Sequence, residues 1–263
     1  MPEKPDLQYT EYSFLASYYD EVMKDVDYEA WAEFLDDLIQ LHHPVAMKVH
    51  ELSCGTGSIL IELDRFGTYD LSGSDKSEEM IQMARLKSDS FLSDLLFYQD
   101  DFRNLSKSGS FDVVLSVFDS LNYLLIPDEF EDVFSSVERI LAPEGIFIFD
   151  FTTPAHSIAS IEWLDNEKVY TKSGVRIVRR SVFDQESNLH TNHFSVFSLN
   201  KSEPHVKGEE THLQRAYSIS EIEKAVHTAG WTCLASYSDF EFTKAHAESQ
   251  RVCMVCKPQI KGQ

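Results

Sequence analysis

The chain has 263 residues, 43% of them hydrophobic, and a formal net charge of −21 at pH 7. That length suits one α/β domain with an addition, or two small domains, and buries a core that needs no disulfide framework. The negative charge disfavours nucleic acid and anionic membranes as partners. Four unevenly spaced cysteines, no apolar leader and no membrane-length apolar run predict a cytoplasmic protein without a membrane contact.

Two helices are predicted near the N-terminus. Hydrophobic residues recur at helical spacing from about residue 12 to residue 41, and Asp27 is placed to cap the second helix. Aromatic residues are dense in the same segment. Two interpretations stay open: a helix pair that packs on the core, or a lid that covers a ligand.

Strand and helix patterns then alternate. Strands are predicted at 47–52, 69–74, 95–99, 111–117 and 145–151, with helices at 57–66, 77–87 and 127–141 between them. Such alternation is typical of a doubly wound, mostly parallel sheet, whose strand carboxyl ends meet at one edge. Glu51, Asp75, Asp101 and the segment 117–119 fall at this edge, where open α/β sheets bind ligands.

The pattern changes after residue 152. A helix at 154–163 and β-like stretches at 168–183, 190–199 and 206–217 predict an inserted antiparallel sheet. Ser218 and Glu221 form a capping box for a further helix. Two final strands, at 231–242 and 251–257, would complete a seven-stranded sheet. We therefore expect a helical N-terminal lid (1–41), a ligand-binding α/β domain (42–153 and 218–263) and a substrate-covering antiparallel β insertion (154–217).

The segment 49–60 carries the strongest ligand signal: a strand, a glycine turn and a helix start. A P-loop would need a lysine after the glycines, and a dinucleotide fold would need a third glycine at Leu60; both are absent. Glu51 lies where a pyrophosphate would be repelled. A nucleoside ligand with positive charge fits better, and S-adenosylmethionine (SAM) is such a ligand.

Two further carboxylates fit this ligand. Asp75 follows the second strand, at the position where an acid accepts the ribose hydroxyls. Asp101 follows the third strand and is placed to accept from the adenine amino group.

These segments resemble a known family in sequence order. The segment 49–57 resembles motif I of class I SAM-dependent methyltransferases, 73–77 with Met80 its second acidic motif, and 100–102 its adenine-binding turn. The segments 111–114 and 141–145 resemble its fourth strand and the turn before its fifth. The likeness covers about residues 40 to 260 and implies a Rossmann-like sheet.

A narrower likeness concerns the N-terminal segment. Tyr18-Tyr19-Asp20 with Asp27-Tyr28 and Trp31 is similar to the lid of small-molecule N-methyltransferases that act on glycine or amino sugars. The segments 119–123 and 210–217 look like an uncharacterised bacterial branch of that group.

The resemblance implies a set of SAM-binding residues. Glu51, Gly55 and Gly57 would hold the methionine part, with Tyr19 closing over its carboxylate. The remaining members of the expected set follow the strands along the sheet edge: Ser53, Cys54, Asp75, Lys76, Met80, Asp101, Phe102 and Val117. Met80 and Phe102 have an alternative interpretation as plain core residues.

Ser53 departs from the family pattern, which has a glycine at this position. If the backbone there needs a positive φ, serine costs about 1 kcal/mol or more. A degenerate SAM site would be one consequence.

The acceptor side is less well defined by the sequence. We expect His212, Asp119 and Asn122 to be catalytic, and the acceptor contacts to be Tyr28, Tyr123 and Arg215. Strand alternation puts His212 on the face of Glu210 and Gln214, and Arg215 on the other. His212 is a substrate contact or base, or alternatively a structural histidine. No metal site is expected, because His190, His193, His205 and His212 lack ligand spacing.

The sequence thus predicts a SAM-dependent methyltransferase that acts on a small molecule, an amine in preference to a hydroxyl, as a monomer or homodimer. An RNA or protein methyltransferase and a catalytically silent SAM-binding protein are the alternatives. Identity of the acceptor is set by the lid and the insertion, where the resemblance is least informative.

Overall fold

The computed structural model describes residues 11–106, 109–199 and 205–259. Its main sheet has seven strands in the order β10-β11-β5-β4-β1-β2-β3. The strands are β1 (Lys48–Leu52), β2 (Asp70–Asp75), β3 (Leu96–Gln99), β4 (Phe111–Ser116), β5 (Leu141–Thr152), β10 (Trp231–Ser238) and β11 (Arg251–Pro258). The first five pair in parallel, while β11 is antiparallel to β5 and to β10. The predicted doubly wound sheet is confirmed.

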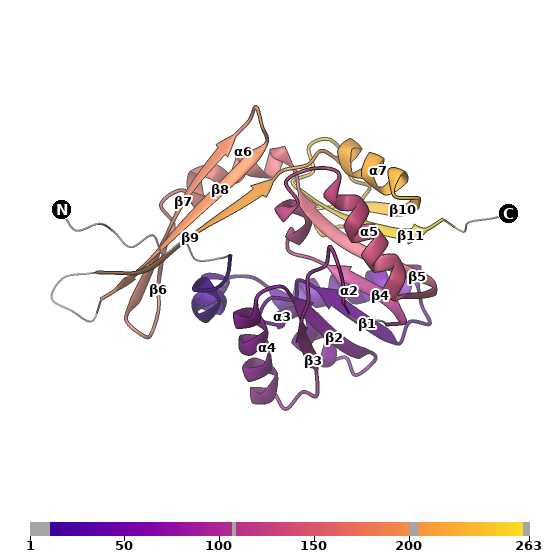
Figure 1. The fold of residues 1–263 in the computed structure, drawn as a ribbon, viewed down its shortest axis with the longest axis horizontal. Helices are drawn as coiled ribbons and strands as arrows, with labels where there is room; N and C mark the ends of the chain where they lie inside the picture. Colours follow the sequence, from indigo (N-terminus) through magenta and orange to yellow (C-terminus); the bar gives the residue numbers. More distant parts are fainter. Residues whose placement is uncertain (1–10, 107–108, 200–204, 260–263) are drawn as a thin grey trace.

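Helices cover both faces of this sheet (Figure 1). One face packs against α2 (Tyr28–His42), α3 (Ser58–Asp64) and α4 (Glu78–Ser90), and the other against α5 (Glu129–Ile140) and α7 (Ile219–Thr228). Strand β5 serves both cores, because Ile146 and Ile148 point to the first and Phe147 and Phe149 to the second. Burial on both faces explains why these strands read as continuous apolar runs.

The insertion forms a separate four-stranded antiparallel sheet in the order β6-β7-β8-β9, which projects from one end of the main sheet (Figure 1). Its elements are α6 (Pro154–Leu164), β6 (Lys168–Tyr170), β7 (Val175–Asp184), β8 (Leu189–Ser198) and β9 (His205–Arg215). The prediction of a single stretch at 168–183 was wrong. A turn divides it, with Gly174 at φ +77° and Thr171 N–H donating to the Val175 carbonyl at 2.9 Å.

The N-terminal segment is less regular than predicted. It contains a 3₁₀ turn, η1 (Leu15–Tyr18), and a single α-helical turn, α1 (Tyr19–Val22), before the long α2. Leu15 packs against Ile177, Phe194 and Val196 of the insertion sheet. By contrast, α2 buries Leu35 and Leu38 in the main core. The core interpretation therefore applies to α2. Residues 11–22 lie beneath the insertion, where the lid interpretation places them.

Predicted caps begin three of the helices. Ser77 accepts from the Met80 N–H at 3.1 Å, and Ser218 and Glu221 form the capping box. Asp27 accepts from the Ala30 N–H at 3.0 Å. The helix expected at Pro127 begins two residues later, at Glu129.

The cap of α2 provides a test of the fold. Asp27→Ala removes the acceptor for the Ala30 N–H, so the free energy of unfolding should fall by about 1 kcal/mol in urea denaturation. Glu33→Ala, at an exposed position of the same helix, is the control and should change it by less than about 0.5 kcal/mol. Equal losses in the two variants would contradict a capping role.

Candidate functional site

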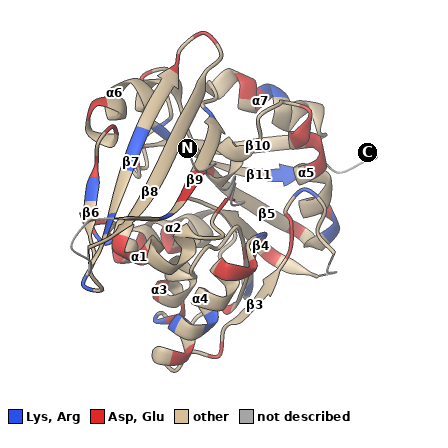
Figure 2. Ribbon diagram, turned by 60° about the vertical axis from the view of Figure 1, so that its left-hand side comes forward, with Lys and Arg blue, Asp and Glu red and all other residues tan. Residues whose placement is uncertain are grey.

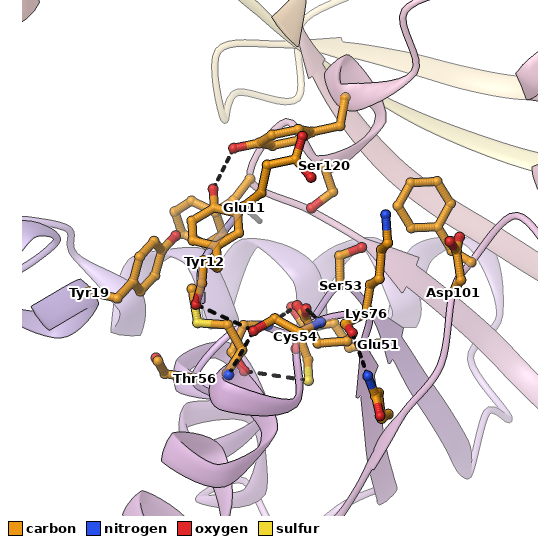
Figure 3. Close-up of a pocket in the computed structure, with 18 of the residues that line it drawn as sticks. Glu11, Tyr12, Tyr19, Glu51, Ser53, Cys54, Thr56, Lys76, Asp101 and Ser120 are labelled. Carbon is orange, nitrogen blue, oxygen red and sulfur yellow. Dashed lines mark hydrogen bonds between the residues drawn. The ribbon is translucent and has the colours of Figure 1, made fainter. Parts of the chain in front are cut away.

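A cavity of about 850 Å³ opens at the carboxyl edge of the parallel strands. The loop after β1 forms one side of it, the ends of β2 and β3 form another, and the segment after β4 and the N-terminal tyrosines complete it. Figure 3 shows Glu51, Ser53 and Cys54 on one side of the cavity and Tyr12 and Tyr19 on another. The sheet edge that was predicted to bind a ligand therefore contains a cavity.

Positive φ angles shape the loop between β1 and α3. Ser53 has φ +52°, Gly55 +54° and Gly57 +76°. Ser53 thus adopts the conformation that glycine favours, which is the condition under which serine carries an energetic cost. Nothing lies within 4 Å of a Cβ added at Gly55, so its backbone is open to a ligand. Gly57 does not line the cavity; a Cβ there would lie 2.8 Å from the Phe97 ring.

Glu51 places a carboxyl group at the end of β1. Its side chain lines the cavity, although the residue is only 3% exposed. Its Oε2 has no hydrogen-bond partner among the described residues. Burial, and then the charge of Asp75, raise the pKa of Glu51 well above its usual value. A cation or a hydrogen-bond donor in the cavity would relieve both effects.

Asp75, at the end of β2, is fixed by the backbone. Its Oδ2 accepts from the Gly55 N–H and its Oδ1 from the Ser77 N–H, each at 2.9 Å. Burial raises the pKa of Asp75 against the opposing effect of these hydrogen bonds. Each carboxylate oxygen keeps a second lone pair, so a pair of neighbouring hydroxyls can bind there.

The end of β3 forms the far part of the cavity. Lys76, Met80, Asp101 and Phe102 all line it. Asp101 receives two side-chain hydrogen bonds from Arg103, at 2.7 and 3.1 Å. Burial acts to raise the pKa of Asp101, but Arg103 outweighs it and the pKa falls. Met80 lines the cavity and is also buried, so it combines the two predicted roles of cavity residue and core residue.

The N-terminal segment closes over the cavity and is tied to the glycine loop. Tyr12, Tyr19 and Tyr28 line the cavity. Asp20 in α1 accepts from Lys87 Nζ and from Thr56 Oγ1, both at 2.6 Å. Three elements therefore meet at one ion pair beside the loop.

Only part of the predicted acceptor side faces the cavity. Tyr28 and Tyr123 line it. His212 does not: it is 1% exposed and lies behind Tyr123, with its Nδ1 2.9 Å from the tyrosine hydroxyl. The same face of β9 carries Glu210, whose Oε2 is 3.2 Å from His212 Nε2.

Two polar residues of the segment after β4 have structural partners instead. Asp119 pairs with Arg251 at 2.7 Å and accepts from Gln214 at 2.6 Å. Asn122 donates to the carbonyls of Thr152 and Arg215 and accepts from the Thr152 N–H at 3.0 Å. Neither residue is among those that line the cavity. Their side chains join the two sheets, and therefore cannot reach a ligand without breaking these bonds.

Arg215 and Val117 also lie outside the cavity lining. Arg215 pairs with Glu221 at 3.0 Å and points away from His212, as strand alternation predicted. Val117 is 1% exposed and belongs to the core, while its neighbours Phe118 and Ser120 line the cavity. Phe118 has a positive φ of +59°.

Sequence reasoning missed several lining residues: Glu11, Tyr12, Thr56, Ser58, Phe118 and Thr211. The density of aromatic residues near the N-terminus was the one signal that pointed to Tyr12. Thr56, Ser58, Phe118 and Thr211 lie in segments that the sequence singled out (49–60, 117–119 and 210–217), but no pattern within these segments marked the side chains themselves. Glu11 carried no signal.

The cavity lining is strongly acidic. Its cationic side chains are Lys76 and Arg103, and its carboxyl groups are Glu11, Glu51, Asp75, Glu78, Glu79, Asp101 and Glu129. Figure 2 shows acidic residues on α1 and both acidic and basic residues on α4, while β7 of the insertion carries Lys or Arg. The lining thus favours a cationic ligand.

The described part of the chain has no group of three or more His, Cys, Asp and Glu side chains that could hold a metal ion. Among the described helices, none has the length and apolar character needed to cross a bilayer.

Known proteins resemble the chain in sequence and in fold. Residues 49–145 match the family described as "Methyltransferase domain". A putative methyltransferase of Bacillus subtilis (strain 168), YqeM, is 32% identical over 242 residues, which cover 92% of this chain and 94% of that protein. An amino-sugar enzyme of Streptomyces venezuelae, dTDP-3-amino-3,4,6-trideoxy-alpha-D-glucopyranose N,N-dimethyltransferase, is 28% identical over 207 residues, covering 78% and 83%.

A solved structure agrees with this. The SAM-dependent methyltransferase of Clostridium acetobutylicum ATCC 824 superposes with a TM-score of 0.76 at 25% identity, covering 94% of this chain and 98% of that one. Sequence, fold and the acidic cavity at the strand edge lead to the same assignment. The chain belongs to the class I SAM-dependent methyltransferases.

Proposed function

We propose that the chain methylates a small-molecule amine held in the 850 Å³ cavity. The observation that carries this proposal is the buried Glu51 carboxyl group with its unpartnered Oε2, set in an acidic cavity beneath tyrosines. Two relatives named as amino-sugar N,N-dimethyltransferases support an amine; they are 28% identical to this chain over 207 and 128 residues. Aromatic side chains line the cavity, which favours a small acceptor over RNA or protein.

The lining fits SAM part by part. We assign Glu51 and the open backbone at Gly55 to the methionine part, and Asp75 to the ribose hydroxyls. Lys76, Met80 and Phe102 would flank the adenine, with Asp101 near its amino group. Tyr19 would cover the methionine carboxylate. When bound, SAM supplies a methyl group already activated by the positive sulfur.

The protein's part in the reaction is then position and exclusion of water. An amine needs only its neutral form to attack a methyl group, whereas a hydroxyl needs a base at its oxygen. Tyr12, Tyr19, Tyr28 and Phe118 exclude water above Glu51, and desolvation with alignment supplies much of the rate. Asp119 and Asn122 act by holding the segment after β4, and Arg215 by anchoring the start of α7.

The first test is ligand binding and labelling. We expect purified protein to bind SAM and S-adenosylhomocysteine in calorimetry, and to transfer label from methyl-labelled SAM to an amine in a metabolite extract, identified by mass spectrometry. Transfer to bulk tRNA or to protein, with none to metabolites, would contradict the small-molecule proposal. Binding without transfer to any fraction would instead favour the catalytically silent alternative.

The raised pKa of Glu51 gives a second test. A bound cation favours the ionised carboxylate, so SAM binding should release a proton wherever Glu51 is protonated in the free protein. Affinity should therefore rise with pH above the usual value of 4.5, by at most about tenfold per pH unit, and level off above the raised pKa. Calorimetry in buffers of different ionisation enthalpy measures the proton directly.

Glu51→Gln should abolish that proton release and weaken SAM binding. Glu33→Gln, at an exposed position on α2, is the matched control and should behave like the wild type. If proton release persists in Glu51→Gln, another group is responsible and Glu51 does not face the cation.

The positive φ of Ser53 gives a third test. Ser53→Gly should raise the free energy of unfolding by up to about 1 kcal/mol, because relief of strain exceeds the added chain entropy, and should keep SAM binding. Gly55→Ala places a Cβ at φ +54° and should instead lower stability by about 1 kcal/mol and weaken SAM binding. A destabilised Ser53→Gly variant would show that the serine side chain has a stabilising role.

A further inference from the structure

A row of hydrogen-bonded side chains leads from the cavity into the insertion sheet. The Tyr12 and Tyr123 hydroxyls lie 2.6 Å apart, and Tyr123 lies 2.9 Å from His212 Nδ1. His212 Nε2 in turn lies 3.2 Å from Glu210 Oε2. Figure 3 shows the Tyr12 hydroxyl making the first of these bonds at the edge of the cavity. Tyr12 and Tyr123 line the cavity, whereas His212 and Glu210 are buried behind them.

Three distant segments build this row. Tyr12 belongs to the N-terminal segment, Tyr123 to the 3₁₀ turn η2 (Ser120–Tyr123), and Glu210 and His212 to one face of β9. The rings pack as well as bond, since the Tyr12 and His212 centroids are 4.5 Å apart and Phe194 covers His212 edge-on at 5.3 Å. The four polar groups are thus held in a fixed geometry.

Glu210 determines the polarity of the row, that is, which group donates and which accepts in each of its hydrogen bonds. Its carboxylate accepts from the backbone N–H groups of Tyr12, Phe14 and Leu15 as well as facing His212. A carboxylate only accepts hydrogen bonds, so His212 must carry its proton on Nε2. In the neutral imidazole, which the proposal takes as the resting form, Nδ1 is then an unprotonated acceptor.

The remaining protons follow from this assignment. Tyr123 must donate its single hydroxyl proton to His212 Nδ1, so its oxygen accepts from Tyr12. The Tyr12 hydroxyl donates its proton to that bond. Its oxygen therefore presents a free lone pair at the cavity, ready for an N–H or O–H of the acceptor.

We propose that Tyr12, Tyr123, His212 and Glu210 form a relay that removes the acceptor's proton, with His212 as the base; this inference rests on the proposed methyl transfer. When the acceptor binds as an ammonium, its proton passes to the Tyr12 oxygen, the Tyr12 proton to the Tyr123 oxygen, and the Tyr123 proton to His212 Nδ1. This leaves the neutral amine that attacks the methyl group. No electrons are gained or lost, and His212 becomes an imidazolium beside the Glu210 carboxylate.

Two further features agree with a relay. Burial raises the pKa of Tyr12 and of Tyr123 well above the usual value, so both phenols stay neutral and pass a proton on without keeping it. The two other residues predicted to be catalytic are occupied, because Asp119 pairs with Arg251, and Asn122 bonds to backbone groups.

The relay also depends on the lid. Glu210 binds the backbone of residues 12–15, and Gly208 leaves room for Phe14, whose ring would be 2.7 Å from a Cβ there. The proton path is therefore complete only when the N-terminal segment is docked on β9. In our proposal, closing the cavity and assembling the base are one event.

His212→Gln is the discriminating variant. A glutamine in this place can accept from Tyr123 and donate to Glu210, so it keeps the bonds of the row but cannot take up a proton. We expect SAM affinity within about threefold of the wild type and label transfer from methyl-labelled SAM to the metabolite extract slowed by about a hundredfold or more. His227→Gln, exposed on α7, is the matched control and should retain full transfer.

A second readout does not depend on transfer. The ¹⁵N chemical shifts of the His212 ring, assigned by their absence in His212→Gln, should show a protonated Nε2 and a bare Nδ1 in the protein without ligand. A protonated Nδ1 would reverse the polarity and overturn the relay. If His212→Gln fails to bind SAM, Tyr12→Phe, which removes only the terminal oxygen, should show the same loss of transfer.

The outcomes separate the two proposals. Transfer by His212→Gln, or by Tyr12→Phe, within threefold of the wild type would show that the row is structural only. Wild-type protein that transfers no label would refute the proposed function, while the tautomer of His212 would still report whether the row has the predicted polarity.

Discussion

A buried carboxyl group at the end of β1 is the constraint on which this site depends. Glu51 is 3% exposed and its Oε2 has no partner among the described residues. Burying such a group costs free energy unless something compensates it. Two nearby features make sense in this light: Gly55 leaves the backbone open beside it, and Asp75 adds a second carboxyl group that raises its pKa further. A cation or a hydrogen-bond donor bound in the cavity would compensate this cost.

A second constraint joins the main sheet to the insertion. Arg251 on β11 pairs with Asp150 on β5 at 2.6 Å and with Asp119 at 2.7 Å, and Gln214 of β9 donates to Asp119. Asp150 is fully buried, so its charge must be paired. This network fixes the turn after β4, in which Phe118 and Asp119 both have positive φ. Catalytic-looking polar residues at a strand edge can therefore be structural.

The lid is held from two sides. Asp20 is bound by Lys87 and Thr56 near the glycine loop, and the backbone of residues 12–15 is bound by Glu210 of the insertion. The segment is short and irregular because its conformation is set by these partners and not by helix propensity.

Much of the donor side could be predicted from the sequence alone, because local pattern determines it. Alternating strands and helices specify a parallel sheet, the sheet brings strand ends to one edge, and Glu51, Gly55, Asp75 and Asp101 are strand-end residues. Ser53 was singled out by its departure from the family's glycine, and its φ of +52° meets the condition for strain. Only the tertiary structure decided the acceptor side. Tyr12 and Glu210 meet across 198 residues of chain, and no periodicity encodes that contact. Whether His212, Asp119 or Arg215 faces a ligand or another side chain of the same chain depends on how the two sheets pack. A sequence pattern is local and does not contain this packing.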